Sequence, residues 1–122
     1  MKIKQLLIPR QRTATITGEV VDTDCYAEQG AKGESHASCA KMCIQGGMPA
    51  GILTSSGQLY IVLGENHKAP AEVVKGLEAK QVTATGKVID KNGTHFMVVS
   101  KIAETKASSS EKSVSEKKSR IQ

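Results

Sequence analysis

The chain of 122 residues is long enough for one domain, and no apolar run in it approaches the roughly 20 residues that a membrane helix needs. Aromatic residues make up only 2% of the chain and tryptophan is absent, which excludes a function built on stacked aromatic rings. The formal net charge is +5, but residues 1–12 carry +4 and residues 104–122 carry +2, so the segment between them carries −1 and a nucleic-acid partner is disfavoured.

The two ends differ in composition from the rest of the chain. Residues 1–12 form a basic N-terminal arm, and its apolar stretch from Leu6 to Ile8 is shorter than the roughly seven residues that a secretory signal requires. We therefore expect a cytoplasmic protein, unless the true start lies elsewhere or a leader has been removed, in which case we expect a periplasmic or otherwise exported one. Residues 104–122 are rich in Ser, Lys and Glu and are predicted to form a disordered tail.

Residues 13–103 are predicted to form the folded domain. A short glycine-containing turn separates the predicted strand over 51–54 from the one over 58–63. The Asn92-Gly93 pair, between the predicted strands over 81–90 and 94–102, is typical of a hairpin. Residues 70–79 are predicted to form a helix that begins at a proline and presents an apolar stripe to the core. Alternating β-branched and polar residues predict strands over 13–22, 51–54, 58–63, 81–90 and 94–102.

Five strands with a helix between the third and the fourth is the order of an OB-like Greek-key barrel, so the predicted fold is mainly β. The segments 15–22 and 83–90 resemble each other. Each contains a glycine, Gly18 or Gly86, at a position where a long strand can bend around a barrel corner. A β-sandwich with different strand pairing is the alternative.

A cysteine-bearing insertion after the first strand is the most unusual part of the sequence. Suitable start and stop residues flank residues 36–45, which are predicted to form a short helix. At about 100° per residue, His36, Cys39 and Cys43 fall within about 60° of one another on one face of that helix. Cys25 leaves the first strand at the head of a glycine-containing loop that can fold back over this face.

These four side chains suit a soft or borderline metal. Thiolate sulfur and imidazole nitrogen match Zn(II), Cu(I) or an iron–sulfur centre far better than Mg or Ca, and three cysteines with one histidine complete a tetrahedron. The spacing Cys-x10-His-x2-Cys-x3-Cys is not the paired Cys-x2-Cys of common zinc modules, so it does not name the metal. The sequence has no Cys-x-x-Cys-His motif and no glycine-rich nucleotide loop, which argues against covalent haem and nucleotide cofactors.

Two aspartates and two methionines near the cluster are predicted to have structural roles rather than to bind the metal. Asp22 and Asp24 share one face of the strand end, but they are interpreted as strand-end charges rather than as a working carboxylate pair. Met42 and Met48 are potential copper ligands, but they are interpreted as packing or surface residues.

Taken together, these patterns predict a non-enzymatic protein that binds a metal ion or metallocofactor, with Zn or Cu as candidates and another protein as a further candidate partner. The predicted ligands are Cys25, His36, Cys39 and Cys43. One alternative is an interaction module stapled by a disulfide from Cys25 to Cys39 or Cys43, which would leave one thiol over. Another is a thiol-redox protein that uses a low-pKa Cys39 beside His36. In a cytosolic protein, the cysteines could also be small buried hydrophobic residues.

The string Gly18-Glu-Val-Val-Asp-x-x-Cys25, followed by His36-x2-Cys39-x3-Cys43 and Gly-Gly-Met-Pro, resembles a set of small bacterial proteins with the same pattern. Those proteins are mostly uncharacterised, OB-like single domains, and the resemblance covers roughly residues 13–103. They are often exported, so the resemblance implies an exported compartment, and it implies no activity or substrate.

Overall fold

The computed structural model describes residues 10–105 of the chain. Residues 1–9 of the predicted basic arm and residues 106–122 of the predicted tail lie outside this range. The described elements are, in chain order, β1 (Arg10–Asp22), α2 (Thr23–Gln29), the 3-10 turn η1 (Glu34–His36), α3 (Ala37–Gln45), β2 (Ala50–Leu53), β3 (Leu59–Gly64), the 3-10 turn η2 (Glu65–His67), α4 (Pro70–Val73), β4 (Gln81–Lys91) and β5 (Thr94–Glu104).

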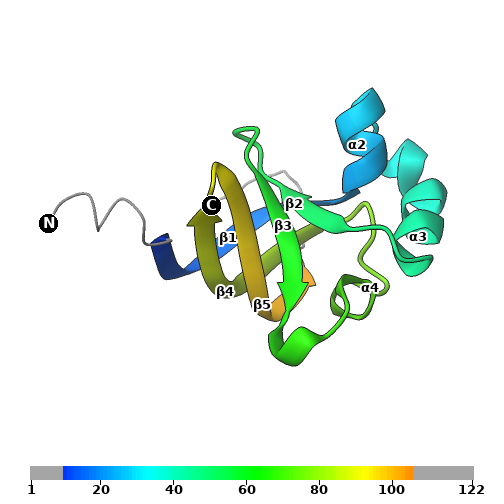
Figure 1. The fold of residues 1–122 in the computed structure, drawn as a ribbon. Helices are drawn as coiled ribbons and strands as arrows, with labels where there is room; N and C mark the ends of the chain where they lie inside the picture. The colour runs from blue at the N-terminus through cyan, green and yellow to red at the C-terminus, as the bar shows by residue number, and fades with distance from the viewer. Residues whose placement is uncertain (1–9, 106–122) are drawn as a thin grey trace, which may run out of the picture.

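The five strands form a closed barrel in the order β1-β2-β3-β5-β4, with β4 pairing back onto β1 (Figure 1). Strand β3 pairs with β5 in parallel, and the other four pairings are antiparallel. This is the strand order of an OB-like Greek-key barrel, so the predicted fold class is confirmed and the sandwich alternative is wrong. The helices α2 and α3 lie side by side at one end of the barrel (Figure 1). No helix within residues 10–105 is both long enough and apolar enough to cross a membrane.

The long strands bend where the sequence places a glycine. Strand β1 pairs with β4 up to Glu19 and with β2 from Glu19 onward, and Gly18 lies immediately before this change of partner. A Cβ atom on Gly18 would lie 2.5 Å from the carbonyl oxygen of Leu53, so only glycine allows this close approach of β1 and β2. Gly86 lies at a register shift between β4 and β5, and a Cβ there would overlap the backbone of Val98.

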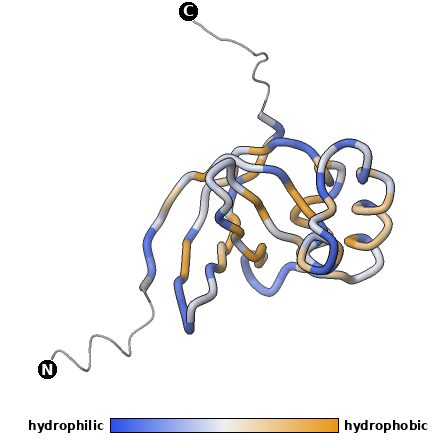
Figure 2. Tube along the Cα trace, turned by 90° about the horizontal axis from the view of Figure 1, so that it is seen from above, coloured by the Kyte–Doolittle hydropathy of each residue, from blue (hydrophilic) through white to orange (hydrophobic). Residues whose placement is uncertain are grey.

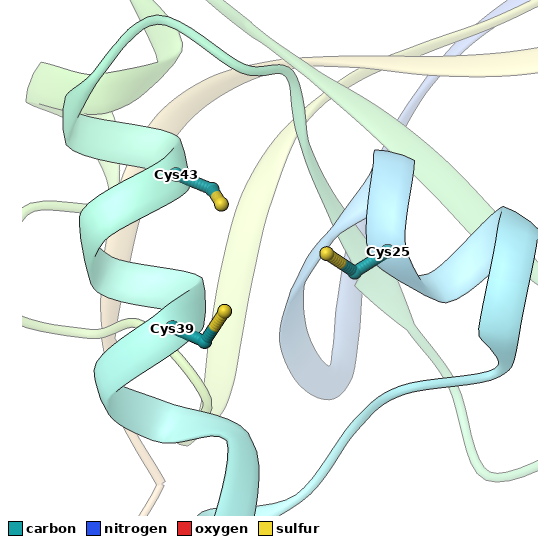
Figure 3. A group of neighbouring side chains, drawn as sticks. All are labelled: Cys25, Cys39 and Cys43. Atoms are coloured by element: carbon teal, nitrogen blue, oxygen red, sulfur yellow. The ribbon is translucent and has the colours of Figure 1, made fainter.

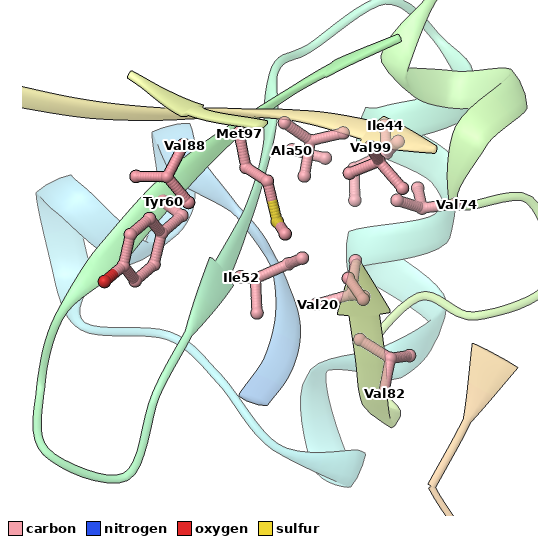
Figure 4. Packing of buried hydrophobic residues seen from close by; sticks show 12 residues of the cluster. Val20, Ile44, Ala50, Ile52, Tyr60, Val74, Val82, Val88, Met97 and Val99 are labelled. Carbon is pink, nitrogen blue, oxygen red and sulfur yellow. The ribbon is translucent and has the colours of Figure 1, made fainter. Parts of the chain in front are cut away.

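Aliphatic side chains from all five strands fill the barrel (Figure 4). The hydropathy colouring in Figure 2 places much of the hydrophobic sequence along the strands. Two further core residues come from the helical segments: Ile44 from α3 and Val74, the residue after α4, are both completely buried. The helices are therefore part of the barrel's core. The buried cluster consists of Val20, Ile44, Ala50, Ile52, Tyr60, Val62, Val74, Val82, Ala84, Val88, Met97 and Val99.

The predicted helix over residues 70–79 is wrong in length, because α4 ends at Val73. The chain then turns at Gly76, whose φ of +83° is incompatible with a right-handed helix. The predicted helix over residues 36–45 begins one residue later, at Ala37, with His36 in the N-cap position. The largest difference is α2, a seven-residue helix where the sequence analysis placed a loop.

The packing of α3 on the barrel can be tested by truncating one side chain on each of its faces. Ile44→Ala removes a completely buried side chain and is expected to reduce the free energy of unfolding by about 2–5 kcal/mol. Met42→Ala, on the same helix, removes a side chain that is 74% exposed, and the expected change is within about 0.5 kcal/mol. Urea denaturation followed by circular dichroism measures both values. Equal effects of the two substitutions would contradict this packing.

A polar cluster centred on Asp90 connects three strands. The carboxylate of Asp90 on β4 accepts a hydrogen bond of 3.1 Å from Arg12 on β1 and shares one of 2.6 Å with Nδ1 of His95 on β5. The interaction with His95 and then that with Arg12 outweigh desolvation and lower the pKa of Asp90. The ionised form is therefore stabilised by folding, and this stabilisation is present above the pKa of about 3.9 of an unfolded aspartate.

We therefore expect Asp90→Asn to destabilise the protein at pH 7 and to have progressively less effect as the pH falls below about 4, where the aspartate of the unfolded chain becomes protonated, until the effect is lost below the lowered pKa of folded Asp90. Urea unfolding of both proteins at pH 7, 5 and 3 measures the difference. A difference that stays constant over this range would contradict the role assigned to the ionised carboxylate.

Candidate metal centre

Helix α2 begins directly at the end of β1, and Asp22 fixes its first turn. Oδ1 of Asp22 accepts hydrogen bonds from the backbone N–H groups of Asp24 at 3.0 Å and Cys25 at 3.4 Å, as an N-cap side chain does. The backbone N–H and the hydroxyl of Thr23 both donate to the carbonyl of Pro49, at 3.1 and 2.9 Å. The first turn of α2, which carries Cys25, is thus tied both to β1 and to the chain segment before β2.

Helix α3 uses one face for the barrel and a neighbouring face for the cysteines. Ala40 and Ile44 are buried, and they anchor the helix against the barrel. Cys39 and Cys43 each precede one of these buried residues, so their side chains point away from the barrel core toward α2 (Figure 3). Since residues four apart lie one turn apart on the same face, the two thiols form a short stripe opposite Cys25.

Side-chain hydrogen bonds hold the two ends of this helical insertion. Glu19 on β1 accepts a hydrogen bond from the backbone N–H of Gly33, which lies between α2 and η1. At the end of α3, Nε2 of Gln45 donates to the carbonyl of Ala71 at 2.9 Å and to the carboxylate of Glu78 at 2.8 Å. The two helices are therefore held in position by contacts other than those between the cysteines.

The structure brings the three cysteines together. The sulfur atoms of Cys25, Cys39 and Cys43 all lie within 4.8 Å of one another, although Cys25 comes from a different helix (Figure 3). All three are free thiols; Cys39 is exposed, and the other two are half-buried. Three sulfur atoms at this spacing around one point can bind a thiophilic cation.

His36 lies beside the thiols but is not a member of that group of three. Its ring belongs to a second group, in which ligand atoms of Asp22, Cys25 and His36 lie within 4.8 Å of one another. Nε2 of His36 is buried and makes no hydrogen bond to any residue within 10–105. The four predicted ligands thus fall into two groups that share Cys25.

Asp22 is the site residue that the sequence analysis missed. It does lie at the end of β1, but its side chain is completely buried, and it contacts the cluster instead of being a simple strand-end charge. Oδ2 is buried and makes no hydrogen bond of normal geometry within the described part of the chain. The available signal was its position three residues before Cys25; its burial depends on the helices that cover the strand end. Met42 and Met48, by contrast, are exposed as expected.

The carboxylate and the thiols shift one another's pKa. Burial by itself raises the pKa of Asp22, but interactions with the thiols of Cys25 and Cys43 and with backbone N–H groups outweigh it, so the pKa is lowered. Asp22 is in turn the main cause that raises the pKa of Cys25 to about 12, and it also raises the pKa of Cys43. The negative charge therefore resides on the carboxylate while these thiols keep their protons. A bound cation reverses this balance, because metal binding displaces protons from thiols.

Comparison of the chain with protein-family models, with curated proteins and with solved structures gave no match. The resemblance to small bacterial proteins and the exported compartment that it implies therefore stay predictions. What this centre does has to be inferred from its own residues.

The influence of Asp22 on Cys25 can be tested by alkylation of reduced, chelator-treated protein. At pH 8, a thiol with a pKa of about 12 is almost entirely protonated, so iodoacetamide is expected to modify the exposed Cys39 well before Cys25. Asp22→Asn removes the main cause of the raised pKa and is expected to accelerate the modification of Cys25. Peptide mass spectrometry over time measures each rate.

Asp24→Asn is the matched control for this experiment, since it removes the same charge from the first turn of the same helix. We expect Cys25 in this control to react as slowly as in the wild type. Equal acceleration by both substitutions, or fast reaction of Cys25 in the wild type, would contradict the assignment to Asp22.

Proposed function

We propose that the protein binds a soft or borderline metal ion through the thiolates of Cys25, Cys39 and Cys43, with His36 as a further ligand, and that it performs no turnover of its own. The observation that carries this proposal is the convergence of three sulfur atoms from two helices within 4.8 Å. Zn(II) and Cu(I) are the candidate ions, since both prefer thiolate and imidazole donors.

The spacing of the sulfur atoms is close to what such an ion requires. Zn–S bonds of about 2.3 Å in a tetrahedron place the sulfur atoms roughly 3.8 Å apart. A spacing within 4.8 Å exceeds this value by at most about 1 Å. Both helices that carry the cysteines are held by other contacts, α2 at Pro49 and α3 at Ala71 and Glu78.

His36 is the nearest nitrogen donor to this cluster. Its buried Nε2 makes no hydrogen bond within the described residues, and a nitrogen of its ring lies within 4.8 Å of the sulfur of Cys25. A buried imidazole nitrogen without a partner is unfavourable, and coordination to a metal beside Cys25 would satisfy it.

The same site supports the disulfide and thiol-redox alternatives less well. A disulfide uses two of the three converging sulfur atoms and leaves the third unexplained. A redox reaction of Cys39 needs Cys25 or Cys43 as its partner thiol, and the neighbouring carboxylate raises the pKa of both and so disfavours their reactive thiolate forms. A cation, in contrast, uses all three sulfur atoms and is attracted by the carboxylate.

Metal analysis of anaerobically purified protein, combined with thiol counting before and after chelation, separates these functions. Metal binding predicts a stoichiometric amount of bound metal and three reactive thiols after chelation. One free thiol that is unchanged by chelator but rises to three with reductant would identify the disulfide-stapled alternative. Three free thiols with no metal bound after reconstitution with Zn(II) or Cu(I) would also contradict the proposal.

The double substitution Cys39→Ser and Cys43→Ser is expected to abolish metal uptake, because only one thiolate remains. The barrel should still form, since neither cysteine belongs to the buried core. Far-UV circular dichroism measures the fold, and equilibrium dialysis measures uptake. The control double substitution Ser38→Ala and Met42→Ala changes two exposed positions of the same helix and should retain uptake. Undiminished uptake by the Cys39/Cys43 variant would contradict the proposal.

A further inference from the structure

Two buried side-chain atoms lack a hydrogen bond within residues 10–105, and both lie in this centre. They are Oδ2 of Asp22 and Nε2 of His36. Ligand atoms of these two residues and of Cys25 lie within 4.8 Å of one another. The two residues that carry these atoms therefore belong to one group with Cys25, whose sulfur also belongs to the three-thiol group.

The charge of Asp22 is not explained by its role as the N-cap of α2. That role uses Oδ1 alone, and a neutral Asn or Ser side chain caps a helix about as well. Neither of the ion pairs within the described part of the chain involves Asp22, so no Lys or Arg side chain there compensates its charge. A completely buried carboxylate without a counter-charge is costly. A cation at the cluster supplies this missing counter-charge.

We propose that Asp22 is itself a ligand of the metal centre, with Oδ2 as the donor atom, and that this oxygen makes the centre selective for a borderline divalent cation such as Zn(II) over Cu(I). This inference rests on the metal-binding function proposed above. It adds a carboxylate to a donor set that otherwise consists of sulfur and nitrogen.

Both charge and donor type favour the divalent ion. Three thiolates and one carboxylate carry four negative charges, of which Zn(II) neutralises two and Cu(I) only one. Carboxylate oxygen is a regular ligand of Zn(II), whereas Cu(I) is selected by soft sulfur donors. Zn(II) also expands from four to five ligands, so it can use an oxygen in addition to nitrogen and sulfur. Because Cys25 belongs to both groups, a single ion beside its sulfur is within reach of both.

Asp22→Asn tests the inference with little change in shape. The amide oxygen retains the cap of α2 and the side chain keeps its volume, but the charge and the strong oxygen donor are lost. We expect the affinity for Zn(II), measured by competition with a chromophoric chelator, to fall about tenfold or more. The affinity for Cu(I), measured anaerobically with a competing Cu(I) ligand, should stay the same or rise. Asp24→Asn removes an equal charge outside both groups and should leave both affinities unchanged.

Each outcome of this experiment has a distinct meaning. Zn(II) affinity of the Asp22 variant equal to that of the Asp24 control, or equal losses for Zn(II) and Cu(I), would overturn the assignment of Asp22 as a ligand while leaving the metal-binding function intact. A wild-type protein that binds neither ion would instead refute the metal-binding function itself.

Two checks keep the test valid if the first variant folds poorly. Asp22→Ser also caps the helix and removes the carboxylate, so it should give the same selective loss of Zn(II). With Co(II) as a probe, sulfur-to-cobalt charge-transfer bands should persist in both variants because the three thiolates remain. The ligand-field bands should shift relative to the Asp24 control, and unshifted bands would overturn the ligand assignment.

Discussion

The buried carboxylate of Asp22 is the interaction on which the arrangement of this centre depends. Asp22 is the last residue of β1 and pairs with Ala50, the first residue of β2, so the barrel fixes its backbone. One oxygen of its side chain starts α2 and thereby places Cys25 over the end of the barrel. The other oxygen is buried and makes no hydrogen bond within the described residues. The side chain of Asp22, held by the barrel, therefore both sets the direction of α2 and supplies negative charge to the site.

This arrangement has opposite effects on the cysteines with and without a cation. Asp22 places Cys25 close to Cys39 and Cys43, but its negative charge raises the pKa of the Cys25 thiol to about 12 and opposes formation of a thiolate. Metal binding supplies positive charge at the same point, so carboxylate and thiolates are then stabilised together. The same residue that keeps the thiols protonated can thus strengthen their hold on a divalent ion.

Most of the barrel could be predicted from the sequence, because its signals are local. Alternating β-branched residues, the Asn92-Gly93 turn and the glycines Gly18 and Gly86 each act within a few residues, and the order of the elements then restricts the topology. The stripe of His36, Cys39 and Cys43 followed in the same way from helical periodicity. Local signals left open whether Cys25 lies close to this stripe, because its position depends on how the whole chain folds.

The elements that sequence reasoning missed depend on contacts between distant residues. Helix α2 has no buried residue and therefore no apolar stripe in its sequence; it forms through the Asp22 cap and the hydrogen bonds from Thr23 to Pro49. The burial of Asp22 likewise depends on two helices that pack over the strand end. In the centre, α3 is fixed to the core by the completely buried Ile44, whereas α2 has no buried residue. A metal that joins Cys25 to Cys39 and Cys43 would thus connect the weakly packed α2 to the firmly packed α3. Metal binding would then be coupled to folding through the ordering of α2.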